Sequence, residues 1–144
     1  MLPKPQTTRK ARLLFATFIG LIFWSLTLSA HTFAAFFDRE RPLKVSGIIV
    51  KVDLTNPDSF VHVRVEDPAT GKAVVWAFMT LPPTALKGIF HLDASVLKEG
   101  EKVTVIAWPE KPGADSTNNV QDPELLNRLK SEKRGFAAQF EFSN

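Results

Sequence analysis

The 144-residue chain contains no cysteine and no tyrosine, and it has only three histidines. Without thiols it has no disulfides, thiolate metal sites or cysteine nucleophile, so a folded domain depends on its hydrophobic core alone. The chain also lacks a Gly-x-Ser-x-Gly motif and a glycine-rich phosphate loop. The chain therefore lacks the common sequence signatures of hydrolases, thiol redox enzymes and nucleotide-binding enzymes, and we expect a protein that is not an enzyme.

Acidic residues are absent from the first 30 positions, which carry four basic residues, Lys4, Arg9, Lys10 and Arg12. An apolar run from Leu13 to Ala30 follows and ends in Leu-Ser-Ala before His31. A basic segment, an apolar segment and a small residue at the cleavage point are the layout of an export signal. We therefore predict a periplasmic protein, and cleavage after Ala30 makes His31 its first residue.

The apolar run also has the length of a membrane anchor. Its 18 residues exceed the ~7–15 of an ordinary signal segment. As a helix they would extend about 27 Å, close to the hydrocarbon thickness of a bilayer. Two interpretations of residues 1–30 therefore stay open: a cleaved signal peptide, or an uncut anchor in the inner membrane with its basic end in the cytoplasm. In both, the domain of residues 31–144 faces the periplasm, and only residues 13–30 would enter the membrane.

The net charge of +3 comes from this export segment. Four of the 18 basic residues and none of the 15 acidic residues precede His31, so residues 31–144 carry 14 basic and 15 acidic groups, a net charge of −1. Nucleic-acid binding requires a basic surface on the folded domain, and we expect no nucleic-acid partner. The remaining length is sufficient for one small domain with a single core.

Five segments have the composition of β-strands: residues 43–52, 60–66, 72–79, 102–108 and 135–142. Alternation in the last strand puts Phe136, Ala138, Phe140 and Phe142 on one face. Proline and capping signals predict short helices over 83–90 and 123–130. A helix between the third and fourth of five strands is the connectivity of the OB-fold, a Greek-key barrel. We predict a mainly β, five-stranded OB-like barrel preceded by the signal or anchor helix, with a β-sandwich as the alternative.

Several short motifs follow one another in a distinctive order over residues 30–108. They are Ala30-His31-Thr32-Phe33-Ala34, Phe37-Asp38, Gly47, Thr55-Asn56-Pro57, Gly71-Lys72, Trp76, Leu97-Lys98-Glu99-Gly100-Glu101 and Val103-Thr104-Val105. In this order they resemble an uncharacterised family of small exported bacterial proteins, a domain of unknown function. Family members have a second histidine where this chain has Thr32, and a histidine after Asn-Pro where it has Asp58. The resemblance implies export and an OB-like barrel, and it supplies no activity.

We predict a ligand-binding face on the second and third strands. Alternation directs the three valines of residues 60–66 inward and the other residues outward. On OB-folds this face binds oligonucleotides or oligosaccharides, and aromatic rings stack on the ligand. Because nucleic acid is not expected, a sugar, a peptide or another small ligand remains. The residues expected to form this face are Phe60, His62, Arg64, Trp76 and Phe78.

That aromatic patch has a second interpretation. The phenylalanines of the segment before the first strand, Phe33, Phe36 and Phe37, or the second predicted helix, would cover it as a small additional core. Buried aromatic rings would then stabilise the fold and would not contact a ligand.

A copper site is a separate hypothesis. With His31 as the first residue, its amine and imidazole nitrogens suit Cu(II), and His62, Asp38 or Asp58 would complete the ligand shell. The chain has no His-x-His or His-x-x-x-His spacing that would strengthen this idea. In the alternative interpretation His31 is simply the residue after a signal cut, and we expect no other cofactor.

Together these observations predict an exported, non-enzymatic binding or accessory module. Its partner would be a small ligand, or a periplasmic or membrane protein. A copper-binding protein based on His31, and a structural subunit held in a membrane complex by residues 13–30, are the two alternatives.

Overall fold

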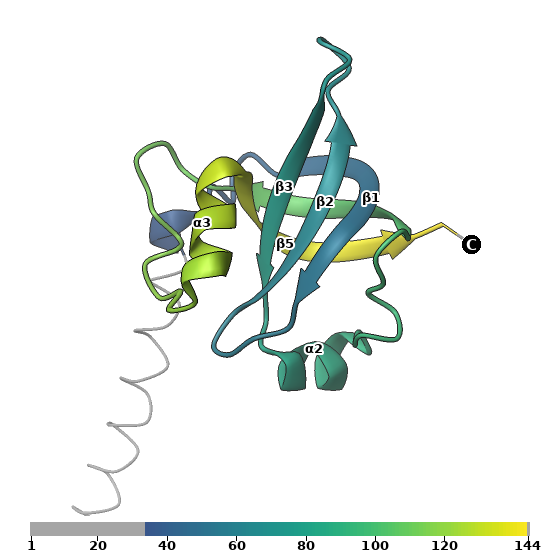
Figure 1. Ribbon diagram of the computed structural model, residues 1–144, viewed down its shortest axis with the longest axis vertical. Helices are drawn as coiled ribbons and strands as arrows, with labels where there is room; N and C mark the ends of the chain where they lie inside the picture. The colour runs from purple at the N-terminus through teal and green to yellow at the C-terminus, as the bar shows by residue number, and fades with distance from the viewer. Residues whose placement is uncertain (1–33, 144) are drawn as a thin grey trace, which may run out of the picture. The chain divides into compact units, whose positions relative to one another are not determined.

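The computed structural model describes residues 34–143, so the predicted export segment and His31 lie outside the described residues. Figure 1 shows the strands arranged around a barrel, with short helices at the ends of the strands. Within residues 34–143, no helix is long and apolar enough to cross a membrane. The strands are β1 (Leu43–Asp53), β2 (Ser59–Glu66), β3 (Ala73–Thr80), β4 (Lys102–Pro109) and β5 (Lys133–Phe142), and the helices are α2 (Pro83–Phe90) and α3 (Pro123–Ser131).

The five strands close into a barrel in the order β1-β2-β3-β5-β4. β3 and β5 are parallel, and the other neighbouring strands are antiparallel. Closure gives every strand a hydrogen-bonded neighbour on both sides, so the sheet has no edge strand. The fold is therefore a mainly β barrel with a short helix between β3 and β4, as predicted, and the alternative of a sandwich is wrong.

β1 completes the ring because it pairs with β2 at one end and with β4 at the other. This requires a bend, and the register slips between Ile49 and Lys51. A Cβ atom at Gly47 would collide with the carbonyl oxygen of Arg64 and lie 2.8 Å from Cγ1 of Val63. Glycine at this position lets β1 and β2 approach closely where β1 curves.

Inward-facing side chains of all five strands fill the barrel. The alternation predicted for β2 is confirmed, because Val61 and Val63 are buried, and Val103 and Val105 of β4 lie in the same buried cluster. Leu97, from the loop before β4, joins the same cluster. The core therefore depends on branched aliphatic residues from strands that lie far apart in the sequence.

The predicted face of β5 is confirmed for Phe140 and Phe142 but wrong for Phe136 and Ala138, because the strand does not keep one alternating pattern. Its register against β4 slips between Ile106 and Ala107, which leaves Ala138 without a partner there. Ala137 belongs to the core, and Phe140 and Phe142 pack against it. Phe136 instead lies beside Phe37 and Trp108, with ring centroids 5.8 and 5.7 Å apart. A bulge of one residue exchanges the two faces of a strand.

Candidate functional site

The predicted ligand-binding face does not exist as one surface. Trp76 of β3 lies opposite Val63, and Phe78 lies opposite Val61. Directly paired residues share a face of the sheet, so both rings belong to the barrel interior, where they stack with centroids 5.6 Å apart. Phe60, His62 and Arg64 lie on the opposite face.

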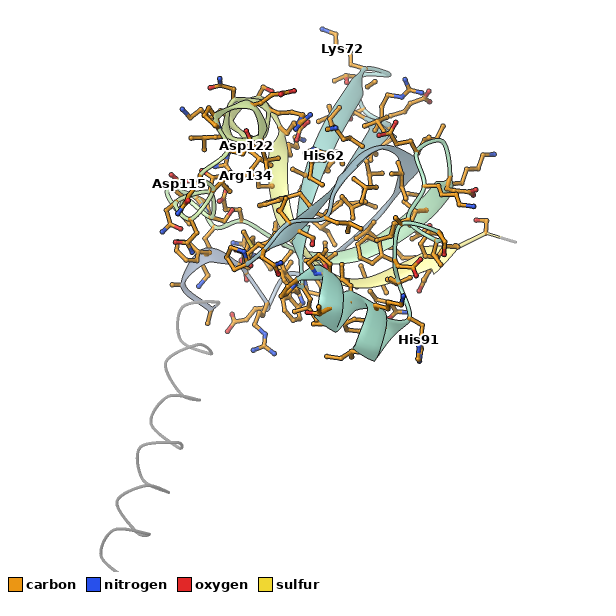
Figure 2. All side chains as sticks on the ribbon, turned by 60° about the horizontal axis from the view of Figure 1, so that its bottom comes forward. His62, Lys72, His91, Asp115, Asp122 and Arg134 are labelled. Atoms are coloured by element: carbon orange, nitrogen blue, oxygen red, sulfur yellow. The ribbon has the colours of Figure 1, made fainter. Side chains whose placement is uncertain are left out.

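On that opposite face, only one of the three predicted residues reaches solvent freely. Phe60 is 2% exposed and His62 is 0% exposed, whereas Arg64 is exposed. In Figure 2, His62 is labelled beside α3, whose end provides one of its partners. The prediction of a flat aromatic platform is therefore corrected, because the barrel encloses two of its rings and the third ring is covered.

His62 connects three elements of the fold. Its Nδ1 lies 2.7 Å from Oε2 of Glu132, at the end of α3, and its Nε2 lies 3.0 Å from Oδ2 of Asp53, at the end of β1. The same Asp53 oxygen lies 3.3 Å from Nη2 of Arg128 in α3. Both ring nitrogens of His62 are therefore already engaged by carboxylates.

The other predicted copper ligands are also separated. His31 lies outside the described residues, and the Asp38 carboxylate pairs with the guanidinium of Arg41 at 2.7 Å. That hydrogen bond lowers the pKa of Asp38. In the part of the chain that the structure describes, no group of three or more His, Cys, Asp or Glu residues could hold a metal ion. Among residues 34–143, His62, Asp38 and Asp58 therefore form no metal-binding group, and the copper site at His31 stays a prediction.

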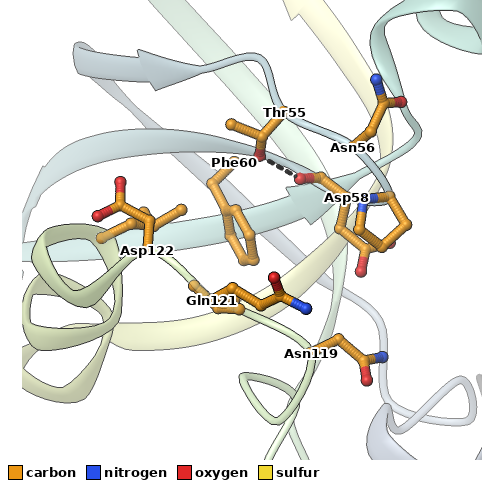
Figure 3. A pocket seen from close by; sticks show the side chains of 10 residues that line it. Thr55, Asn56, Asp58, Phe60, Asn119, Gln121 and Asp122 are labelled. Carbon is orange, nitrogen blue, oxygen red and sulfur yellow. Dashed lines mark hydrogen bonds between the residues drawn. The ribbon is translucent and has the colours of Figure 1, made fainter.

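A cavity of about 250 Å³ opens between the β1–β2 loop and the segment that leads into α3 (Figure 3). One wall comes from the β1–β2 loop, and the opposite wall comes from residues 119–122. Phe60 and Leu125, both buried, provide apolar lining. The complete lining is Thr55, Asn56, Pro57, Asp58, Phe60, Asn119, Val120, Gln121, Asp122 and Leu125.

Local hydrogen bonds hold both walls in place. The Thr55 hydroxyl donates to the backbone oxygen of Asp58 at 2.6 Å, which closes the β1–β2 loop on itself. On the opposite wall, the Asp122 carboxylate accepts from the backbone N–H of Glu124 at 3.0 Å and caps α3. The walls are therefore shaped before any ligand arrives.

The polar groups of the cavity are amides and carboxylates. Asn56, Asn119 and Gln121 carry side-chain amides, each with donors and an acceptor. Asp58 and Asp122 carry the carboxylates, and none of the lining residues is basic. Burial raises the pKa of Asp58. These amides and carboxylates can bind the polar groups of a small ligand. The lining residues do not include a nucleophile paired with a base.

Sequence reasoning named Phe60 and Asp58, but for other roles, and it missed the remaining cavity residues. The Asn56-Pro57-Asp58 turn and the polar loop before α3 were visible as loops. The usable signal was topological: the loops between strands 1 and 2 and between strands 4 and 5 are neighbours in OB-like barrels.

The model of a family of unknown function, DUF6152, matches residues 20–119. The chain belongs to the DUF6152 family. The matched range extends from before β1 to the first residue of the second cavity wall, and α3 and β5 follow it. A comparison with curated proteins gives no match. Membership of DUF6152 assigns no activity, and the function must be argued from the cavity.

Proposed function

We propose that this DUF6152 protein is an exported, non-enzymatic binding module whose ligand occupies the cavity between the β1–β2 loop and the start of α3. The observation that carries this proposal is that three residues with side-chain amides and two with carboxylates, from two loops, line one cavity that also has apolar lining. Concave sites with a few convergent polar groups are the usual form of small-ligand sites.

The topology supports the same location. Closure in the order β1-β2-β3-β5-β4, with a helix between β3 and β4, is the arrangement of an OB-like Greek-key barrel. OB-folds bind ligands on the face of strands 2 and 3 and at the loops between strands 1 and 2 and between strands 4 and 5. Because Phe60 and His62 on that face are buried, the loops are the part of the usual binding region that a ligand can reach.

The ligand class follows from size and charge. A volume of about 250 Å³ lies just below the roughly 300–1,000 Å³ of drug-sized ligand sites, which favours a single small molecule or one unit of a larger one. The lining contains no basic residue, and residues 31–144 carry a net charge of −1. Nucleic acids and other polyanions therefore fit this site poorly.

Export is supported by the basic and apolar layout of residues 1–30. Cell fractionation and the mass of the purified chain test this part. A chain found in the periplasm that begins at His31 supports a cleaved signal, and an intact chain in the membrane fraction supports an anchor. A chain found in the cytoplasm contradicts export.

The binding function is tested by NMR on the isotope-labelled chain as purified from the cell envelope, titrated with a library of sugars, amines and amino acids. We expect shift changes confined to residues 55–60 and 119–125. Gln121→Ala removes one hydrogen-bonding group and should weaken binding about 3- to 10-fold, since such a bond contributes about 0.5–1.5 kcal/mol. The matched control Thr70→Ala lies in the exposed β2–β3 loop and should change nothing. Shifts that cluster elsewhere, or no binding at all, would overturn the proposal.

A further inference from the structure

Asp58 is the carboxylate of the cavity that accepts no hydrogen bond within residues 34–143, whereas Asp122 accepts one. The side chain of Asp58 is half-buried. In residues 34–143, its carboxylate makes no ion pair or side-chain hydrogen bond, and burial alone accounts for its raised pKa. A carboxylate removed from water without a partner is unfavourable for the fold.

The second carboxylate of the cavity, Asp122, is already satisfied. It accepts a hydrogen bond from the N–H of Glu124. It also lies at the N-terminus of α3, where the helix dipole stabilises negative charge. The unmet charge of the cavity is therefore concentrated at Asp58, and no lysine, arginine or histidine lines the cavity to neutralise it.

The remaining polar lining suits neutral groups. The amides of Asn56, Asn119 and Gln121 (Figure 3) can each donate to and accept from hydroxyl or carbonyl groups. We propose that the ligand of this cavity carries an ammonium group, which pairs with Asp58, on a small scaffold whose hydroxyl or carbonyl groups meet the three amides. This inference rests on the proposed function and names the charge of its ligand. An amino sugar and the amine of a peptide share this chemistry.

Two matched series of probes separate these sources, with binding measured by calorimetry on the chain purified from the cell envelope. The first compares glucosamine with glucose and glucuronate, which share a ring and differ in charge. The second compares Gly-Lys-Gly, blocked by an N-terminal acetyl and a C-terminal amide, with the same blocked peptide acetylated on the lysine side chain. In one series, we expect the ammonium form to bind at least about 10-fold more tightly than its neutral counterpart, since a hydrogen bond to a charged group is stronger than a neutral one. The series that shows the preference identifies the source.

Variants connect the preference to one side chain. Asp58→Asn should remove the advantage of the ammonium probe while binding of the neutral probe changes little. Asp93→Asn, an acid outside the cavity lining, is the matched control and should keep the preference. Asn119→Asp adds a carboxylate to the cavity wall and should increase the preference, which gives a test that does not depend on loss of function.

Equal binding of charged and neutral probes, or an ammonium preference that survives Asp58→Asn, overturns this inference. Absence of binding in both series overturns it as well. None of these three results removes the proposed function, which the wider NMR titration decides from the location of the shifts.

Discussion

Asp58 is expected to lower the stability of the fold at neutral pH. Burial raises the pKa of this carboxyl above its ordinary value of 3.8, so the folded chain holds the proton more tightly than the unfolded chain does. Protonation of Asp58 therefore stabilises the folded chain. This contribution to the free energy of unfolding is complete below pH 3.8 and is lost as the pH rises through the folded-state pKa. Asp58→Asn removes the charge and should raise the midpoint of thermal unfolding at neutral pH. The difference from the wild type should shrink in acid.

Asp115 provides the opposite case in the same molecule. The hydroxyl of Thr117 donates to its carboxylate at 2.6 Å, and this bond lowers the pKa of Asp115 below 3.8. Its stabilisation is present above pH 3.8 and is lost as the pH falls through the folded-state pKa. Asp115→Asn should therefore lower the midpoint at neutral pH and have little effect in acid. Thermal scans in which both variants shift in the same direction at neutral pH would contradict this account of the two carboxylates.

His62 is predicted to be the most sensitive polar residue of the fold. The ring is fully buried between Asp53 and Glu132. His62→Ala leaves Glu132 without the ring as a partner, whereas Asp53 keeps Arg128, and we expect it to cost about 1–3 kcal/mol of unfolding free energy, as when a buried polar group loses its hydrogen bond. Urea denaturation measures the loss. Adding Glu132→Gln to the His62→Ala variant removes one uncompensated charge and should recover part of it. A loss below about 1 kcal/mol would indicate that water replaces the ring.

At the scale of the elements, β1 depends on a residue without a side chain. A Cβ atom at Gly47 would collide with the backbone of β2 at Arg64, and backbone cannot rotate away. Gly47→Ala should therefore destabilise the barrel by about 1–3 kcal/mol, the usual cost of overpacking. Gly88→Ala is the matched control, because a Cβ atom there meets nothing within 4 Å and lies in α2. It should be neutral or stabilise by up to about 1 kcal/mol. Similar losses in chemical denaturation of the two variants would contradict the steric argument.

The elements themselves were largely predictable from sequence, and their bounds lie within two residues of those observed. Proline, glycine and charged turns mark where strands stop, so local chemistry was sufficient. The faces were harder to predict. Alternation assigns the residues of a strand to two faces. It does not show which face of β3 lies on the same side of the sheet as the valines of β2. The pairing of Val61 with Phe78 therefore placed two expected ligand-binding rings inside the barrel.

Two further features depended on contacts that no local pattern encodes. The slip in register at Ala138 is a property of two strands together, because neither sequence alone shows where the extra residue lies. The cavity combines loops separated by about sixty residues of sequence, and its amides are ordinary loop residues when each loop is considered alone. Phe60 was named for its ring and Asp58 for its charge, and only the fold brings them to one cavity.

At the scale of the whole molecule, the cavity lies across the boundary of the family match. The wall of residues 55–58 lies inside the matched range, whereas most of the opposite wall follows Asn119. Asp58 lies within the matched range, at the position where the family resemblance implies a histidine, so the charge that we assign to it is a feature of this chain. The amides that would orient the ligand lie on both sides of the boundary. Family membership alone cannot specify the ligand, because the cavity requires both walls.

The same boundary gives a prediction about folding. β5 follows the matched range and pairs with both β3 and β4, so it is the strand that closes the ring between them. A chain that ends at Asn119 would expose the edges of β3 and β4 and lose Ala137, Phe140 and Phe142 from the core. We expect this chain to show no cooperative thermal transition and to bind a hydrophobic dye, because exposed apolar surface remains. A chain that ends at Phe142 retains β5 and should unfold like the full-length protein. Cooperative unfolding of the shorter chain, measured by circular dichroism, would show that four strands are enough and that closure of the barrel is not what stabilises the domain.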